Sequence, residues 1–262
     1  IKQKIFDKQP YSEWIKGNRT KLRLLPEPKE LHPSFEADQL KTRQLAFGYS
    51  NEDVRTILKP MVEDGKEPLG SMGTDTPIAV LSNQPQHLSF YFKQLFAQVS
   101  NPPIDPIRER LVMSLFTRVG TSKNILAETP EHCRQIHISQ PVLDKSNFEK
   151  LLQWDHKHYN YKIINILFNA DGKAGRLEEG INEICKEAEK AIAEGSNILV
   201  LSDRNLSKNR AAIPSLLALG AVQNHLVKNK IRTKASLIVE CGDALEVHHF
   251  ATLVGFGASA IY

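Results

Sequence analysis

The second half of the chain alternates between two patterns of apolar residues. Short continuous apolar runs occur at residues 163–168, 197–202, 235–240 and 258–262. Between them, apolar residues recur every three or four positions, over residues 177–192, 214–228 and 247–254. Continuous runs are typical of strands buried on both faces of a parallel sheet, and the wider spacing is typical of amphipathic helices. Residues 160–262 are therefore predicted to form a β-α-β-α-β-α-β series.

Successive βα units of this kind belong to barrels or to doubly wound sheets. A closed eight-stranded barrel takes about 250 residues, and this chain shows too few strands to close one. We therefore predict an α/β fold with a mostly parallel sheet, similar to an incomplete TIM barrel. Because Tyr262 lies inside the last apparent strand, we expect the chain to be a fragment of a longer protein.

The first half is less regular. Prolines interrupt residues 1–45 repeatedly, at Pro10, Pro26, Pro28 and Pro33. These residues are predicted to be an irregular connector that lies across another surface, and residues 46–262 the α/β domain.

Local signals predict several elements between the connector and the repeating units. Ser50 and Asp53 form a capping-box pattern that opens a helix, and Gly65 ends it. The apolar run 78–81 is read as a buried strand, and residues 90–99 as a helix. Residues 107–119 fit a helix or a strand equally well. Ser146 and Glu149 form a second capping-box pattern, which predicts a helix to residue 154.

Composition narrows the class of protein. With 41% hydrophobic and 24% charged residues, the chain is globular, which excludes disordered and fibrous proteins. No apolar run approaches the roughly 18–20 residues that span a bilayer, so no membrane association is expected. The three cysteines, Cys133, Cys185 and Cys241, are odd in number and widely spaced, which argues against a disulfide framework and favours a cytoplasmic protein.

The net charge of +4 comes from the first 60 residues, which hold 12 basic and 8 acidic residues and so carry the whole excess. Basic and aromatic residues interleave only briefly there, at residues 14–16 and 19–23. A nucleic-acid surface needs a longer basic stripe, so no nucleic-acid partner is expected.

Polar residues follow the predicted strands, where parallel α/β folds place their chemistry. They are Asn169, Asp171, Asp203, Arg204, Glu240 and Asp243. A carboxylate here could act as a base and Arg204 could hold an anion, so one hypothesis is a stand-alone small-molecule enzyme that uses Asp203, Arg204 and Glu240. Helix capping and loop solvation are the alternative roles for such residues.

Three other candidate motifs do not indicate a catalytic, metal or nucleotide site. Cys241 follows a strand but has no evident base, so it is interpreted as a small buried hydrophobic residue. The adjacent His248 and His249 point about 100° apart on a helix and cannot chelate one ion, so no metal site is expected. No glycine pattern has the spacing of a nucleotide-binding loop.

Five stretches of sequence resemble one family, the central domain of the glutamate synthase large subunit. They are residues 67–82, 91–109, 128–132, 197–204 and 246–250. Residues 10–14 also resemble the family's connector from a preceding domain, so the resemblance covers essentially the whole chain.

The resemblance implies a role inside a larger enzyme. In this family a glutamine amidotransferase domain precedes the central domain, and a barrel that binds FMN and an iron–sulfur cluster follows it. The resemblance implies that this chain links those two domains, helps to channel ammonia between them, holds no cofactor itself and is inactive alone. The parent enzyme converts L-glutamine, 2-oxoglutarate and two electrons into two L-glutamate molecules, in some cases with a small NADPH-oxidising subunit. The sequence does not decide whether the parent enzyme takes its electrons from NADPH or from ferredoxin.

The resemblance also suggests where ammonia passes. It implies that one loop lines the channel, formed by Met72, Gly73, Thr74, Asp75, Thr76 and Pro77. Gly73 allows close backbone approach, and the threonines and Asp75 offer hydrogen-bonding groups. An ordinary connecting loop is the alternative reading.

Overall fold

The computed structural model describes residues 2–68, 78–93, 99 and 102–262. Its centre is a four-stranded parallel sheet with the order β4-β6-β8-β9. The strands are β4 (Tyr161–Asn165), β6 (Ile198–Ser202), β8 (Ser236–Glu240) and β9 (Ala258–Ile261). The helices between them are α8 (Arg176–Ala193), α9 (Ser215–Lys228) and α10 (Val247–Gly255). The predicted series of strands and helices is confirmed.

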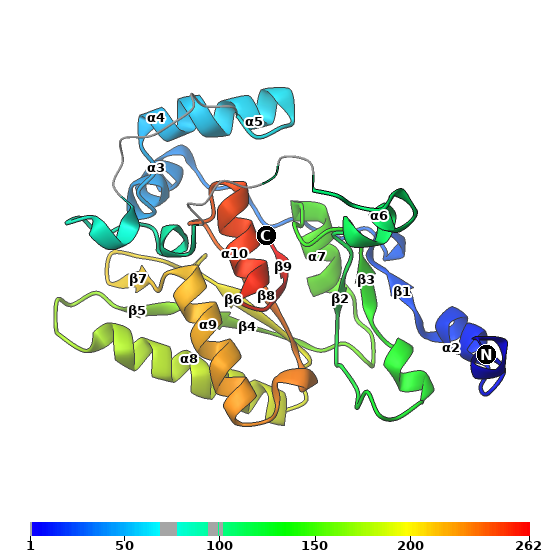
Figure 1. Cartoon of the computed structure of the whole chain (residues 1–262). Helices are drawn as coiled ribbons and strands as arrows, with labels where there is room; N and C mark the ends of the chain where they lie inside the picture. The colour runs from blue at the N-terminus through cyan, green and yellow to red at the C-terminus, as the bar shows by residue number, and fades with distance from the viewer. Residues whose placement is uncertain (1, 69–77, 94–98, 100–101) are drawn as a thin grey trace.

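The path through this sheet is that of part of a barrel. Each strand pairs with the next one of the series in parallel register, and α8, α9 and α10 contribute to one apolar core on the same face (Figure 1). No closed barrel forms within the described residues. The predicted α/β class, with an incomplete barrel-like sheet, is confirmed.

Both faces of the sheet are buried, which explains why its strands are continuous apolar runs. Leu199 and Leu201 of β6 pack into the core beneath the helices. Their neighbours Ile198 and Val200 face the opposite side and join a second core. Successive side chains of a strand point to opposite faces, so both faces need apolar residues and a cover.

The part of the chain that precedes β4 supplies the second cover. A small sheet with the order β1-β3-β2 lies there beside helix α7 (Figure 1). Its strands are β1 (Thr20–Lys21), β2 (Thr117–Val119) and β3 (Ile136–Ile138), and α7 spans Lys145–Gln153. Ile136, Ile138 and Phe148 are among the residues of the second core. This small sheet was not predicted.

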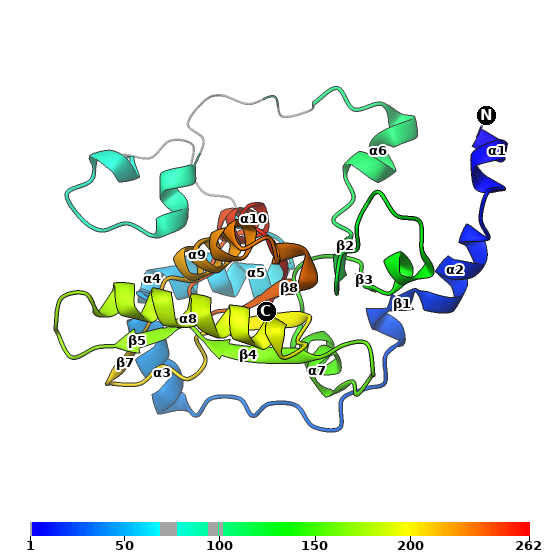
Figure 2. The ribbon, with the colours of Figure 1, turned by 90° about the horizontal axis from the view of Figure 1, so that it is seen from below.

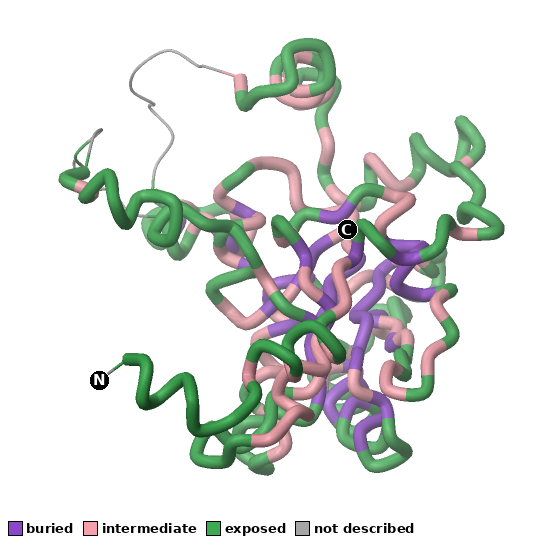
Figure 3. Tube along the Cα trace, turned by 90° about the vertical axis from the view of Figure 1, so that its right-hand side faces the viewer, coloured by how far each residue is buried: buried purple, intermediate pink, exposed green. Residues whose placement is uncertain are grey.

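The connector contains helices that the sequence pattern did not predict. They are α1 (Lys2–Phe6), α2 (Tyr11–Asn18) and α3 (Ala37–Ala46). Pro10 stands just before α2, where its missing N–H costs no helical hydrogen bond. None of the three helices has a buried residue, and Figure 3 shows the N-terminal stretch as exposed. Between β1 and α3 the chain is extended and crosses the molecule (Figure 2).

The remaining elements are short. They are α4 (Asn51–Asp53), a π-helical turn (Val54–Leu58), α5 (Lys59–Asp64), α6 (Pro106–Val112), the antiparallel pair β5 (Leu167–Asn169) and β7 (Arg210–Ala212), and 3₁₀ turns at Leu22–Leu24, Ala79–Leu81, Leu88–Phe92, Pro130–Cys133 and Arg232–Lys234.

The helix predicted from Ser50 to Gly65 and the open segment 107–119 both agree with the structure. The capping box of Ser50 and Asp53 is confirmed, and Gly65 ends the helix with a φ of 64°. The open segment 107–119 contains both a helix, α6, and a strand, β2.

Three other local predictions fare differently, and the strand at 78–81 is wrong. Residues 78–81 form a 3₁₀ turn rather than a strand, and Val80 and Leu81 are exposed. Of the predicted helix 90–99, residues 90–92 belong to a 3₁₀ turn, and residues 94–98 lie outside the described part, so the rest stays a prediction. The helix predicted from Ser146 is confirmed as α7, but Asp144 rather than Ser146 caps it and accepts from the Asn147 N–H at 2.7 Å. Glu149 is buried and bonded to His32 instead.

The close packing of α8 on β5 predicts opposite effects for two glycine substitutions. A Cβ at Gly180 would lie 2.8 Å from Phe168 Cβ and 3.4 Å from its Cα, whereas at Gly220 of α9 the nearest atom is Phe256 Cδ1 at 3.5 Å. Overpacking costs about 1–3 kcal/mol, and replacing a helical glycine by alanine gains about 0.5–1 kcal/mol. We expect Gly180→Ala to lower the free energy of unfolding by about 1 kcal/mol and Gly220→Ala to raise it slightly, as measured by urea titration. Equal effects of the two substitutions would contradict this packing.

Candidate functional site

A cavity of about 390 Å³ lies at the carboxyl edge of the main sheet, where β6, β8 and β9 end. Its floor consists of residues at or just beyond the ends of these strands, Asp203, Arg204, Glu240 and Tyr262. The sequence therefore predicted correctly that Asp203, Arg204 and Glu240 meet at one edge. Residues of the connector cover the cavity, which the sequence did not reveal.

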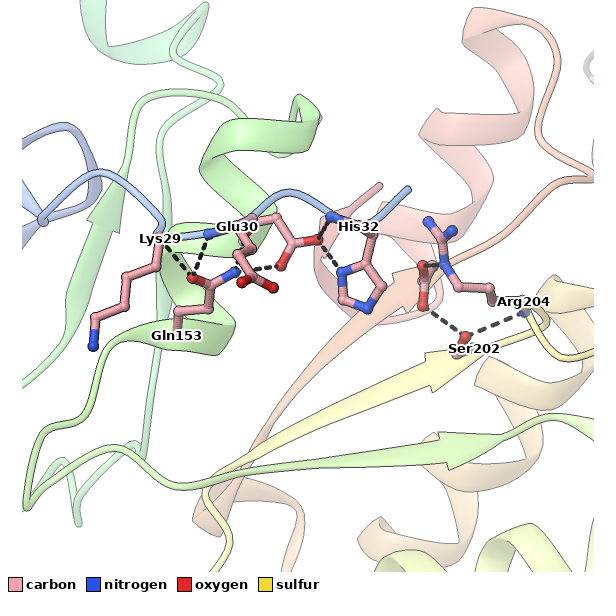
Figure 4. A network of polar contacts seen from close by, with 8 residues as sticks. Lys29, Glu30, His32, Gln153, Ser202 and Arg204 are labelled. Atoms are coloured by element: carbon pink, nitrogen blue, oxygen red, sulfur yellow. Dashed lines mark hydrogen bonds and ion pairs between the residues drawn. The ribbon is translucent and has the colours of Figure 1, made fainter. Parts of the chain in front are cut away.

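A partly buried ion pair, between Arg204 and the buried Glu240, forms the floor. The Arg204 Nε donates to Glu240 Oε1 at 2.5 Å, and the Ser202 hydroxyl donates to Glu240 Oε2 at 2.6 Å (Figure 4). Glu240 is 6% exposed. Both carboxylate oxygens are thus engaged, and the charge is compensated within the fold, so Glu240 is not free to act as a base.

Asp203 is held differently. It is 5% exposed, and its Oδ2 accepts from the Gly242 N–H at 2.8 Å. Burial is the main cause that raises the pKa of Asp203 to about 7, and the nearby carboxylates of Asp243 and Glu240 add to it. The side chain therefore exchanges its proton near neutral pH.

The cover is built by residues around α3. The Arg43 guanidinium donates to the Arg204 carbonyl at 2.6 Å and lies 3.9 Å from the Phe35 ring centre. The Tyr49 hydroxyl donates to the Gly242 carbonyl at 2.7 Å, and burial raises the pKa of this phenol to about 12. The cover therefore binds main-chain atoms just beyond β6 and β8.

The stretch leading to this cover is fastened to α7. The Lys29 N–H donates to Gln153 Oε1 at 2.9 Å, and the His32 N–H and ring contact the Glu149 carboxylate (Figure 4). Nearby, the Lys150 ammonium donates to Glu27 at 2.6 Å. These partners were missed by sequence reasoning. The available signal was a pair of charged residues, Glu149 and Lys150, between the apolar Phe148 and Leu151 of one helix.

The other polar residues predicted at strand ends bond to groups near their own loops and do not line the floor of the cavity. Asp243 accepts from the Ser215 N–H at 2.9 Å where α9 begins, and Asp171 pairs with Arg176 at 2.9 Å. Asn169 lies in β5, outside the main sheet. Cys241 packs against the main core, and burial raises the pKa of its thiol well above the ordinary value, so it stays protonated at neutral pH. The interpretation of Cys241 as a packing residue agrees with this environment.

Two further observations concern the described part of the chain. There, no group of three or more His, Cys, Asp or Glu side chains is arranged to hold a metal ion. In the same residues no helix is long and apolar enough to cross a membrane. The loop predicted to line the channel, residues 72–77, lies outside the described residues.

A model of the family "glutamate synthase central domain" matches residues 42–262. This chain belongs to that family. The resemblance predicted from the sequence is confirmed, and the strand ends described above are those of a glutamate synthase central domain.

Full-length relatives extend the comparison. The glutamate synthase [NADPH] large chain of Bacillus subtilis is 43% identical over 261 residues, which cover 100% of this chain and 17% of the relative. The chloroplastic ferredoxin-dependent glutamate synthase 2 of Arabidopsis thaliana is 43% identical over 264 residues, 100% of this chain and 16% of the relative. Glutamate synthase [NADH] of Schizosaccharomyces pombe is 47% identical over 220 residues, 83% of this chain and 10% of the relative.

These relatives are much longer than the chain, which spans about a sixth or less of their length. Their names include NADPH, ferredoxin and NADH, at comparable identity to this chain. The sequence of the central domain therefore does not distinguish the electron donors.

The buried carboxyl of Asp203 predicts a pH dependence of stability. Its pKa is about 7 in the folded chain against an ordinary value of 3.8, so the folded state holds this proton more tightly than the unfolded state. Its contribution to stability is complete below pH 3.8, falls as the pH rises, and is lost above about pH 7.

Asp203→Asn removes this loss because its side chain never ionises. We expect the variant to gain stability over the wild type between pH 4 and 8, on the order of 2 kcal/mol at the upper end. Urea titrations at several pH values measure this difference, with the exposed Asp155→Asn as the control. A difference that does not vary with pH would contradict the assigned environment of Asp203.

Proposed function

We propose that this chain is the structural and ammonia-channelling domain of a glutamate synthase. It links a glutamine amidotransferase domain to a synthase domain that carries FMN and an iron–sulfur cluster. The parent enzyme converts L-glutamine, 2-oxoglutarate and two electrons into two L-glutamate molecules. Membership of the central domain family and the names of the relatives support this proposal.

One observation carries the structural role. The strand ends, where parallel α/β enzymes place catalytic groups, are occupied here by the Arg204–Glu240 pair and covered by residues around α3. The side chains that could act on a substrate are instead bonded within the sheet edge, and the cover binds main-chain carbonyls beside them. This arrangement fits a rigid body between two reaction sites better than a third reaction site.

A rigid body between the two reaction sites would guide ammonia from one site to the other. Ammonia released into neutral water is protonated and diffuses away, whereas a protein-walled path excludes water and keeps it reactive. A sheet packed on both faces holds the two sites at a constant distance. We assign the wall of the path to the loop of residues 72–77, and we assign FMN and the cluster to other domains of a cytoplasmic parent enzyme.

Exposed apolar residues support contact with neighbouring domains. Ile107 and Leu111 of α6 are 91% and 80% exposed, and Ile125 and Leu126 are 92% and 89% exposed. Clusters of large exposed apolar side chains mark interaction surfaces. We infer that the amidotransferase and FMN-binding domains of the parent chain cover these residues, while a small NADPH-oxidising subunit binds elsewhere on the parent.

The channelling role predicts that a bulky residue in the loop uncouples the two half-reactions. In the full-length enzyme, Gly73→Val should leave glutamine hydrolysis in place but lower glutamate formation, and added ammonium should restore it. The measurement is the ratio of glutamine consumed to 2-oxoglutarate converted. The control is Gly17→Val, because a Cβ at Gly17 would meet no atom within 4 Å. An unchanged ratio in a correctly folded Gly73→Val enzyme would show that ammonia does not pass this loop.

The alternative function is a stand-alone enzyme that uses Asp203, Arg204 and Glu240. The observation in its favour is the cavity at the sheet edge.

An experiment with a single and a double variant separates a structural role of Arg204 and Glu240 from a chemical one. Removing one partner of a buried ion pair costs roughly 3 kcal/mol, whereas replacing both by apolar residues is often neutral. We expect Arg204→Met to destabilise the chain by that amount, and Arg204→Met with Glu240→Met to recover most of it. In the full-length enzyme, the double variant should also recover glutamate synthesis. Loss of activity in a stable double variant would assign these residues a chemical role.

A further inference from the structure

The outer face of the small sheet carries a row of basic side chains. Lys21 of β1 and Arg118 of β2 both pair in register with His137 of the middle strand β3. The alternate residues Val119, Ile136 and Ile138 are buried in the second core. Because side chains alternate between faces, Lys21, His137 and Arg118 lie side by side on the opposite face.

Two residues of this row, Lys21 and His137, line a cavity of about 330 Å³. Arg19, Lys21 and Arg23 line it along one chain segment, and His137 and Phe116 line it from the neighbouring strands. The polar side chains of Ser139, Gln140 and Asn147 complete its lining. A cavity of this size falls within the range of small-molecule sites.

No carboxylate lines this cavity among the described residues. Within the same part of the chain, no ion pair joins Arg19, Lys21, Arg23 or Arg118 to an acid. The acid on the α7 side, Asp144, is engaged by Asn147, whose main-chain N–H and side-chain amide donate to it at 2.7 and 2.9 Å. The positive charge of the row is therefore not balanced within the described fold.

The electrostatic environment agrees with this geometry. Burial and then the positive charges of Arg118, Arg19 and Lys21 lower the pKa of His137 to about 4. His137 is therefore neutral at pH 7 and stands between the two cations Lys21 and Arg118. Phe116 packs edge-on against His137 with ring centres 4.9 Å apart, and the Arg118 guanidinium carbon lies 5.6 Å from the Phe116 ring centre. Arg118 does not line the cavity itself, but its guanidinium lies near Phe116, which does.

We propose that this cavity binds a small anion with at least two negative charges, a dicarboxylate or a phosphate ester. Arginine and lysine side chains recognise both groups through charge-assisted hydrogen bonds, and the amide and hydroxyl groups at the rim supply neutral donors. A bound dianion would offset the repulsion along the row. The lining of this site shares no residue with the cavity at the carboxyl edge of the main sheet, and the proposal does not depend on the proposed function.

The test uses the 262-residue chain and four probes: succinate, glycerol 3-phosphate, acetate and a tetraglutamate peptide. Binding is followed by NMR through the ring signals of His137 and by calorimetry. We expect succinate or glycerol 3-phosphate to bind at least tenfold more tightly than acetate, and the stronger of the two identifies the chemical class. The bound dianion should raise the pKa of His137 by one unit or more, which a titration of its ring signals with and without saturating ligand measures.

Variants locate the site. Lys21→Gln with Arg118→Gln should weaken dianion binding at least tenfold, and Arg23→Gln alone should weaken it less. The matched control, Lys208→Gln with Lys228→Gln, removes the same charge from exposed positions elsewhere and should change affinity less than twofold. Unchanged core amide signals establish that each variant is folded. The proposal is overturned if acetate binds as tightly as the dianions, if both double variants weaken binding equally, or if only tetraglutamate binds, which would indicate an acidic protein segment instead.

Discussion

The parallel sheet must be covered on both faces, and the rest of the molecule follows from this requirement. β6 and β8 are buried along their whole length, and their apolar residues alternate between two cores. The crossover helices α8, α9 and α10 cover one face, as the connections of parallel strands do by necessity. The other face has no local cover. It depends on β1, β2, β3 and α7, which come from the preceding part of the chain.

This dependence gives the N-terminal segment a structural task. After contributing β1 to the small sheet, it runs along α7 through Glu149 and Gln153, and reaches the carboxyl edge at Arg43. Each fastening joins residues more than a hundred positions apart. A segment with exposed helices thereby becomes part of the domain without adding much to its core. In a multidomain glutamate synthase, this N-terminal segment would also set the position of the domain that precedes it.

The carboxyl edge illustrates how a common catalytic position can serve the fold. Arg204 and Glu240 neutralise one another out of contact with most of the solvent, and Asp203 remains protonated for part of the time near neutral pH. The cost of burying these groups is offset because every charge has a partner or a proton. The basic row on the small sheet differs in this respect, since its charges lack partners within the described residues. The two places therefore suit different tasks, internal fastening and the binding of an external anion.

The sequence by itself determined the series of strands and helices over residues 160–262, the capping box at Ser50 and the family, because periodicity, caps and long motifs are local properties of the chain. It also placed Arg204 and Glu240 at one edge, since parallel strands end on the same side. Only the tertiary structure decided which apolar run becomes a strand. Residues 78–81 have the composition of a strand but form a 3₁₀ turn, and the short β1, β2 and β3 form because they pair with one another. The partners of Glu149, Arg43 and His137 lie far away in sequence. Such contacts depend on how separate segments meet in space, which no local pattern encodes.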